Sequence, residues 1–336
     1  MRIYILKRLA VAVIVVFGVS LTTFVIARVL PGDPAYLVAG QNADQQTIAA
    51  TRHRLGLDAS IPAQYVHYLR DLASGSLGTS LTTSHSVVSD LGQRLPATFE
   101  LALVSIFLAM ILCAAIGTAA ALRPRGMAAR AADVLSAGGA AVPQFWLGLM
   151  AIFVFFFKLG WFPAPLGRYP SEFEPHHITG FLLIDTLIEG HPGEWIKALW
   201  MIVLPALTLA LTVQPPLLRI TQVAMRRAIS SDAIRTARSM GLPEWRVIGH
   251  DALRLALAPI LNMLALVFGV LLSSSVLVET VFSWPGIGQY AVQAINASDY
   301  PAIQGVVLVT ALAYVLLYLL VDVIAVALDP RLRGAR

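Results

Sequence analysis

The feature that most constrains this 336-residue chain is a series of long apolar segments that are nearly free of charge. A hydrocarbon layer about 30 Å thick is crossed by roughly 20 apolar residues in a helix, which satisfies its own backbone hydrogen bonds. Six segments meet this requirement, at approximately residues 9–30, 99–122, 134–157, 196–218, 255–278 and 303–327. The pattern predicts an all-α integral membrane protein with about six transmembrane helices.

The composition supports this class of protein. Hydrophobic residues make up 57% of the chain and charged residues 13%, whereas a soluble domain has about 25% charged residues. The net charge of +5 does not indicate nucleic acid, because basic residues beside apolar spans are the usual topology signal. The single cysteine, Cys113, lies in an apolar segment, which excludes an internal disulfide and a cysteine-rich metal site.

Lysine and arginine are concentrated in alternate loops, and such loops are cytoplasmic. Of the 24 basic residues, 16 fall on one side, namely Arg2, Lys7, Arg8, Arg123, Arg125, Arg130, Arg219, Arg226, Arg227, Arg235, Arg238, Arg246, Arg254, Arg331, Arg333 and Arg336. The other eight are spread over much longer loops. We therefore expect both termini in the cytoplasm, in a multi-pass protein of the cell inner (plasma) membrane.

The spans divide the chain into four parts. Residues 1–30 are expected to form an N-terminal segment and an uncleaved first helix, and residues 31–98 a small extracytoplasmic region. Residues 99–328 are expected to form a transmembrane domain of five helices, followed by a cytoplasmic tail at 329–336. The apolar stretch 178–188 is too short to cross a membrane and contains Asp185, so an interfacial or docked helix is predicted there.

The cytoplasmic loop 219–254, between helices 4 and 5, has the chemistry of a short helix, a tight turn and a second helix. Ser230 or Ser231 can cap the first helix, and Asp232 favours its positive end. Gly241 can end that helix in the left-handed conformation, and Pro243 is typical of the start of the next one. A basic loop that only fixes the topology is the alternative interpretation.

The run Asp232–Gly241, followed by Val247, His250, Leu253 and Pro259, resembles the EAA loop of ABC importer permeases. The resemblance implies a coupling helix that fits a groove on a cytoplasmic ATPase and transmits ATP-driven motion to the membrane helices. The residues implied in this contact are Asp232, Ala233, Thr236, Ala237, Arg238, Gly241 and Leu242. Ala233 departs from the family pattern, because related permeases often have a tyrosine there.

Further motifs along the chain resemble the dipeptide, oligopeptide and nickel permease family, and they occur in the same order. They are Leu30–Pro34, Leu55–Asp58 with Gln64–Tyr65, Gly75–Ser80, Glu279–Gly288, Asp299–Pro301 and Leu328–Arg331. Each motif alone is weak, since turns beside membranes share such residues. Together they identify the chain as similar to the permease subunit of a binding-protein-dependent ABC importer.

The resemblance implies the rest of the assembly. A second homologous permease would complete the translocation path, two cytoplasmic ATPase subunits would bind ATP and Mg, and an extracytoplasmic substrate-binding protein would contact region 31–98. Short peptides, either di- or oligopeptides, are the first expected substrates. Nickel complexes, glutathione or another small solute are the alternatives.

The chain itself has no sign of catalysis. A P-loop needs a glycine-rich turn that ends in Gly-Lys-Ser or Gly-Lys-Thr, but Lys7, Lys158 and Lys197 follow other residues. Metalloprotease and nucleophile-elbow motifs are also missing from the sequence, and the adjacent His176 and His177 are interpreted as loop residues. We expect a non-enzymatic subunit with no catalytic residue, cofactor or metal of its own.

Polar residues within the spans are candidates for function because they are costly in lipid. Gln144, Gln214, Ser273, Ser274 and Ser275 are predicted to line the path, whereas other span residues, including Asn262 and Asp322, are interpreted as packing residues. A transporter driven by an ion gradient is the other class considered. It predicts an ionisable group near the membrane midplane, but Glu279 and Asp322 lie near the span ends.

Overall fold

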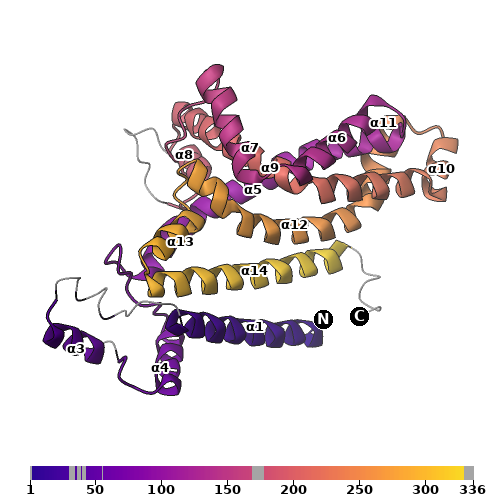
Figure 1. Ribbon diagram of the computed structural model, residues 1–336. Coiled ribbons are helices and arrows are strands. Elements are labelled where there is room, and N and C mark those ends of the chain that lie inside the picture. The colour runs from indigo at the N-terminus through magenta and orange to yellow at the C-terminus, as the bar shows by residue number, and fades with distance from the viewer. Residues whose placement is uncertain are drawn as a thin grey trace. The chain divides into compact units, whose positions relative to one another are not determined.

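The computed structural model describes residues 2–29, 35, 39, 43–54, 56–168 and 178–328. These residues form helices and connecting loops, and no strand occurs among them (Figure 1). The predicted motif segments Leu30–Pro34 and Asp329–Arg331, Leu55 and the pair His176–His177 lie outside the described residues. The chain divides into two compact units, residues 1–96 with 286–316 and residues 97–285 with 317–336.

The first unit combines the N-terminal helices with a corner near the C-terminus. It contains α1 (Arg2–Val29), α3 (Gln45–Arg54), α4 (Ile61–Ala73), the start of α5 (Val87–Leu122), α13 (Ile287–Asn296) and the first part of α14 (Tyr300–Leu328). Aromatic contacts join α4 to α1, and the Tyr65 hydroxyl lies 3.0 Å from the Ser20 hydroxyl. Val87, Leu91 and Tyr290 lie in a separate small core between α5, α13 and α14.

The second unit contains the rest of α5 and the helices up to Val281. They are α6 (Met127–Ala141), α7 (Gln144–Ala151), the π-helical segment η1 (Ile152–Lys158), α8 (Leu182–Ile188), α9 (Pro192–Ile229), α10 (Asp232–Ser239), α11 (Glu244–Arg246), the π-helical segment η2 (Val247–Ala252) and α12 (Leu253–Val281). Helices α9 and α12 lie side by side, with α6 also packed on α9 (Figure 1). Two apolar cores fill the spaces between these helices.

Long apolar helices are the main elements, as the sequence predicts. Four of the described helices are long and apolar enough to cross a membrane: Val87–Leu122, Pro192–Ile229, the continuous Glu244–Val281 and Tyr300–Leu319. Val13–Ile26 is a shorter apolar helical stretch within α1. A bent pair of helices would raise the number of spans to five if it crosses the membrane as one unit.

That bent pair corrects one prediction. Residues 134–157 do not form a single helix, because the chain turns by 109° between α6 and the α7–η1 segment. Pro143 explains the break, since proline has no N–H to donate and disfavours helical geometry in the preceding residue. Val142 is accordingly extended, with φ −93° and ψ 126°.

Two helix boundaries also differ from the predicted spans. Helix α5 begins at Val87, inside the region predicted to end at residue 98, and continues through Pro96. Helix α9 continues to Ile229, so the first part of the predicted loop 219–254 is helical. The chain from Thr221 to Ala228 is rich in good helix formers and buries one apolar face, which extends the helix beyond its hydrophobic span.

The short stretch 178–188 forms the docked helix that its length and its charge predicted. Helix α8 packs against α9, and the Asp185 side chain is 2% exposed. Its carboxylate accepts hydrogen bonds from the backbone N–H groups of Thr179 and Gly180 at 2.9 and 3.0 Å. These bonds compensate for burial of the charge.

Candidate functional site

The loop between α9 and α12 has the predicted helix, turn and helix. Helix α10 begins after the extended Ser231 and ends before Gly241, whose φ is +77°. Gly241 adopts the left-handed conformation that glycine takes at low cost, and so reverses the chain. Ser231 occupies the N-cap position, but its hydroxyl is buried and makes no capping hydrogen bond among the described residues. The backbone, not the predicted side-chain cap, therefore starts this helix.

One face of α10 holds it against the second unit. Ile234 is 1% exposed and belongs to the apolar core that includes Met225 and Val247. Ala237 and Leu242 pack against the same core and are partly buried. Helix α10 is therefore in direct contact with α9 and η2.

The opposite face of α10 and the following turn are exposed. We call this the elbow surface and define it by Asp232, Ala233, Arg235, Thr236, Arg238, Met240 and Trp245. Met240 is 75% and Trp245 is 76% exposed, which is unusual for large apolar side chains beside so many arginines. Sequence reasoning missed both residues, although their apolar character within a basic loop was a usable signal.

An ion pair fixes the shape of the elbow surface. The Arg238 guanidinium donates two hydrogen bonds to the Glu244 carboxylate, with N···O distances of 2.8 and 3.2 Å. This bidentate pair joins the end of α10 to the start of α11 across the Gly241 turn, and its planar geometry is specific to arginine. Trp245 follows Glu244 directly and is exposed beside this pair.

The predicted path residues fall into two groups. The Gln214 side chain is 1% exposed and donates a hydrogen bond from α9 to the Leu135 carbonyl of α6 at 3.3 Å. The Ser275 hydroxyl is also buried and bonds the Leu272 carbonyl of its own helix. In the described structure these two side chains join or support helices.

Gln144, Ser274 and Ser273 lie nearer an open face. The Gln144 amide donates to the Ser274 carbonyl at 2.7 Å and so links α7 to α12. The Ser274 residue is partly buried, and Ser273 is exposed, with a long contact of 3.5 Å to the Gly269 carbonyl. Their role in the path stays a prediction.

A buried ionic cluster ties the loop after η1 to α5 and α8. The Arg168 guanidinium pairs with Glu100, and both side chains are 4% exposed. Arg168 also donates to the Gly180 carbonyl at 2.8 Å, while the Leu183 backbone N–H donates to Glu100 at 2.7 Å. The guanidinium lies over the Trp284 ring, 5.9 Å from its centre. These contacts compensate two charges that burial would otherwise penalise.

The other end of α12 carries a second buried acid. Glu279 is fully buried and accepts a hydrogen bond from the Thr98 hydroxyl of α5 at 2.8 Å. The Trp284 indole donates to the Ala97 carbonyl at 2.9 Å, which adds another link between α5 and the end of α12. The motif Glu279–Gly288 therefore contributes its acid and its tryptophan to interhelical contacts.

In the first unit, two motifs distant in sequence meet at Asp299. Its carboxylate accepts hydrogen bonds from the Ser80 hydroxyl at 2.6 Å and from the Thr82 backbone N–H at 3.0 Å. It also accepts one from the Ala302 backbone N–H at 3.2 Å, at the start of α14. Asp299 is fully buried, so these bonds fasten the loop before α5 to the corner between α13 and α14.

Tyr290 strengthens the same unit. Its hydroxyl donates to the Asp90 carboxylate at 2.9 Å, and Arg94 lies over its ring at 4.8 Å from the centre. Burial raises the pKa of Tyr290 to about 12. The hydroxyl therefore remains a proton donor to Asp90 across the physiological pH range.

Replacing Asp299 with alanine should loosen this corner. The Ser80 hydroxyl and the Thr82 and Ala302 N–H groups would lose their common acceptor, at a cost of about 2 to 4 kcal/mol. Limited proteolysis between residues 78 and 86 should become faster in D299A than in the wild-type protein. The exposed Asp71 provides the control, since D71A should leave the cleavage rate unchanged. Equal rates for D299A and wild type would contradict the assignment.

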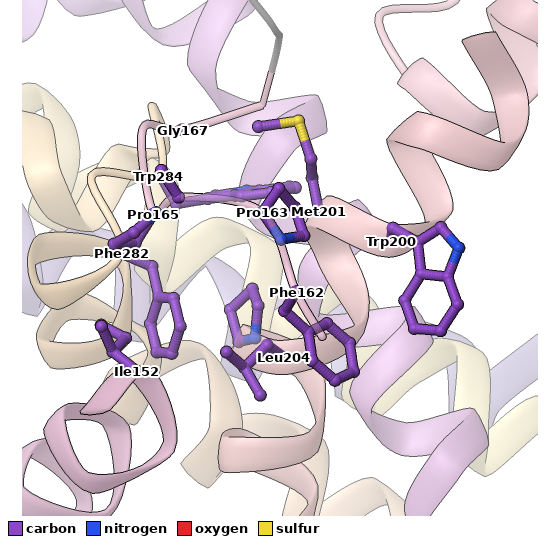
Figure 2. Close-up of a pocket in the computed structure, with 12 residues that line it drawn as sticks. Ile152, Phe162, Pro163, Pro165, Gly167, Trp200, Met201, Leu204, Phe282 and Trp284 are labelled. Atoms are coloured by element: carbon purple, nitrogen blue, oxygen red, sulfur yellow. The ribbon is translucent and has the colours of Figure 1, made fainter. Parts of the chain in front are cut away.

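The second unit also contains a small apolar hollow lined by twelve residues. Figure 2 shows Phe162, Trp200 and Phe282 among the side chains around it. None of its twelve lining residues is ionisable, so the hollow has no group for acid–base or metal chemistry. Among the described residues, no cluster of three or more His, Cys, Asp or Glu side chains forms a metal site.

Comparison with known proteins covers nearly the whole chain. Residues 111–334 match the family described as the binding-protein-dependent transport system inner membrane component. Residues 1–102 match the N-terminal family model of the same kind of transport system membrane component.

Several curated relatives align end to end. The chain is 40% identical to the probable D,D-dipeptide transport system permease protein DdpB of Escherichia coli K12, over 95% of this chain and 94% of the relative. It is 38% identical to the di/tripeptide transport system permease protein DppB of Pseudomonas aeruginosa, over 99% of each chain. It is 34% identical to the glutathione transport system permease protein GsiC of Salmonella typhi, over 98% of each chain.

Proposed function

Because the chain belongs to the family of inner membrane components of binding-protein-dependent transport systems, we propose that it is an importer permease for short peptides. The family places the protein in the inner membrane as a non-catalytic subunit. ATP hydrolysis and capture of the substrate belong to partner proteins of such a system.

The observation that carries the mechanism is the position of the elbow surface between two long apolar helices. Helix α9 leads into α10, and α11 continues through η2 into α12 without a break. A partner that grips Met240 and Trp245 would therefore act on both helices. Exposed aromatic and methionine side chains are preferred at the centres of protein interfaces.

The seven residues implied by the family resemblance fall into two groups, those that would contact the ATPase and those that would hold α10 and its turn in place. Asp232, Ala233, Thr236 and Arg238 are exposed and would contact the ATPase, together with Met240 and Trp245. Ala237 and Leu242 would transmit the movement, because they pack against the core. Gly241 would keep the turn tight through its positive φ.

In the complete importer, this chain would pair with a second homologous permease above two ATPase subunits. Six crossings with both termini in the cytoplasm agree with the lysine and arginine distribution, if α1 and the bent pair each cross once. Region 31–98 would then lie outside and contact the substrate-binding protein. Each ligand can drive the cycle only by preferring one of the two access states.

The names of the relatives support a peptide substrate. Two of the three relatives described above are named for D,D-dipeptides and for di- and tripeptides, and the third for glutathione, itself a small peptide. Glutathione and nickel complexes are the alternatives to be tested against dipeptides.

Reconstitution of the whole importer tests the proposal. Proteoliposomes that contain this chain, its partner permease, the ATPases and the receptor should accumulate radiolabelled dialanine only when ATP is enclosed with the ATPases. Unlabelled glutathione and a nickel complex serve as competitors. Accumulation should persist when an uncoupler removes the ion gradient.

Two outcomes would contradict the proposal. Uptake that stops with the uncoupler while ATP remains high would indicate an ion-gradient transporter instead. Uptake by this chain alone, without ATPases, would refute the proposal that the elbow surface binds an ATPase to drive transport.

A further inference from the structure

One face of α12 is exposed along most of its length. We define the α12 stripe as Asn262, Leu266, Val270, Ser273, Leu277 and Thr280, spaced by three or four residues. This spacing places all six on one side of an α-helix. At a rise of 1.5 Å per residue, the stripe extends about 27 Å, which is close to the thickness of the hydrocarbon layer.

The α12 stripe is polar at both ends. Asn262 and Thr280 stand at its two ends, and Ser273 lies in between. The Thr280 hydroxyl donates a hydrogen bond to the Val276 carbonyl at 2.8 Å. Asn262 is exposed, and no hydrogen bond joins its side chain to any residue that the structure describes. A side-chain amide that faces lipid without a hydrogen-bond partner would raise the free energy of the folded protein by several kcal/mol.

The exposed face of α5 provides a contrast within the same unit. Leu103, Phe107 and Ile111 are 50%, 62% and 52% exposed and contain no polar side-chain atom. Such a surface suits lipid. The two faces are therefore exposed to a similar degree but have different chemistry, which indicates different surroundings.

We propose that the α12 stripe lines the passage of the solute and that the Asn262 amide hydrogen-bonds the solute as it crosses. This inference rests on the proposed importer function and revises the packing role expected for Asn262. The alternation of amide, hydroxyl and aliphatic groups fits a peptide, whose backbone needs hydrogen bonds and whose side chains can be apolar.

The stripe carries no charge. Bare divalent cations prefer carboxylate, imidazole or thiolate ligands, and none of these occurs among the six residues. The passage therefore suits short peptides better than a free metal ion. This adds a chemical reason for the peptide class to the likeness of the sequences.

Water accessibility tests the location of the stripe. Single cysteines at Asn262 and Ser273 are compared with cysteines at Leu103 and Phe107 in the assembled importer in membrane vesicles. A membrane-impermeant, positively charged methanethiosulfonate should label N262C and S273C, and dialanine with the receptor should slow that labelling. The native Cys113 is 1% exposed and gives a low background. L103C and F107C should remain unlabelled.

Uptake measurements test the hydrogen bond. N262L should lower the rate of dialanine uptake about tenfold, the effect of one lost hydrogen bond, whereas N262Q should retain most of it. F107L is the lipid-facing control and should transport normally. ATPase association should be unchanged in all three variants.

The failure of this inference can be told from failure of the importer function. If wild-type vesicles import dialanine but N262C is not labelled, or is labelled no faster than F107C, the stripe does not line the passage. Equal uptake rates for N262L and the wild-type protein would refute the proposed hydrogen bond between the Asn262 amide and the solute. Absence of dialanine import by the wild-type assembly would instead contradict the proposed function, and the labelling pattern would still locate the stripe.

Discussion

Replacing Met240 with glutamate and Trp245 with alanine will separate the permease from its ATPases. Each side chain is about three-quarters exposed, and they are the two large apolar side chains of the elbow surface, whose other members are mostly polar or charged. If they act as the central anchors of the interface, each truncation costs about 2 kcal/mol, or about 30-fold in affinity. The change in affinity is measured from the amount of ATPase retained on the purified permease pair at a series of ATPase concentrations.

Met127 offers a matched control for this pair of substitutions. It is 86% exposed at the start of α6, next to the other basic loop expected in the cytoplasm. M127E introduces the same charge in the other loop that is expected to be cytoplasmic, and it should leave ATPase binding within about twofold. Equal losses in M127E and M240E would indicate a general effect of charge, and undiminished binding in the double variant would refute the contact.

Removing Arg168 will cause the largest loss of stability among the substitutions considered. R168M leaves Glu100 buried and without its guanidinium partner, which costs about 3 to 5 kcal/mol. Leu183 would still donate its N–H to the acid, but one backbone bond does not replace the ion pair. Thermal or denaturant unfolding of the purified importer, followed by tryptophan fluorescence, measures the change.

The double variant E100L/R168M separates loss of the pair from loss of packing. Because it removes both charges, it should recover most of the stability that R168M loses. The exposed Arg70 supplies the control for a simple loss of positive charge, and R70M should change stability by less than about 0.5 kcal/mol. A double variant as unstable as R168M would show that the ion pair is not the source of the effect.

Sequence reasoning succeeded where the signal is local. The bounds of helix α10 were predicted from Ser231, Asp232 and Gly241, which act within one or two turns. Gly241 ends the helix as predicted, whereas the Ser231 hydroxyl makes no capping hydrogen bond to any residue that the structure describes. The apolar segments likewise reflect a solvent requirement that each helix meets by itself. A hydropathy profile nevertheless does not show whether a helix axis changes direction. The span 134–157, which includes Pro143, was therefore predicted as one helix, although the chain bends there.

Contacts between distant residues could not be predicted in this way. Asp299 and Ser80 are 219 positions apart, and nothing near either residue specifies the other. Arg168 was counted only as one basic residue of an outer loop, because its partner Glu100 lies in a different helix. The exposure of Asn262 depends on how α9 and α7 cover α12, which is a property of the folded unit.

The unbroken helical run from Glu244 to Val281 has a mechanical consequence. Its 38 residues form a rod about 55 Å long, with Trp245 near one tip and Glu279 held to Thr98 near the other. A sideways force on Trp245 would rotate the helix about its other end, where Glu279 is hydrogen-bonded to Thr98. Displacement would then be greatest at the end of α12 near Trp245 and smallest at the end near Glu279. If the elbow surface meets an ATPase as proposed, the end of the passage beside the ATPase would therefore respond first.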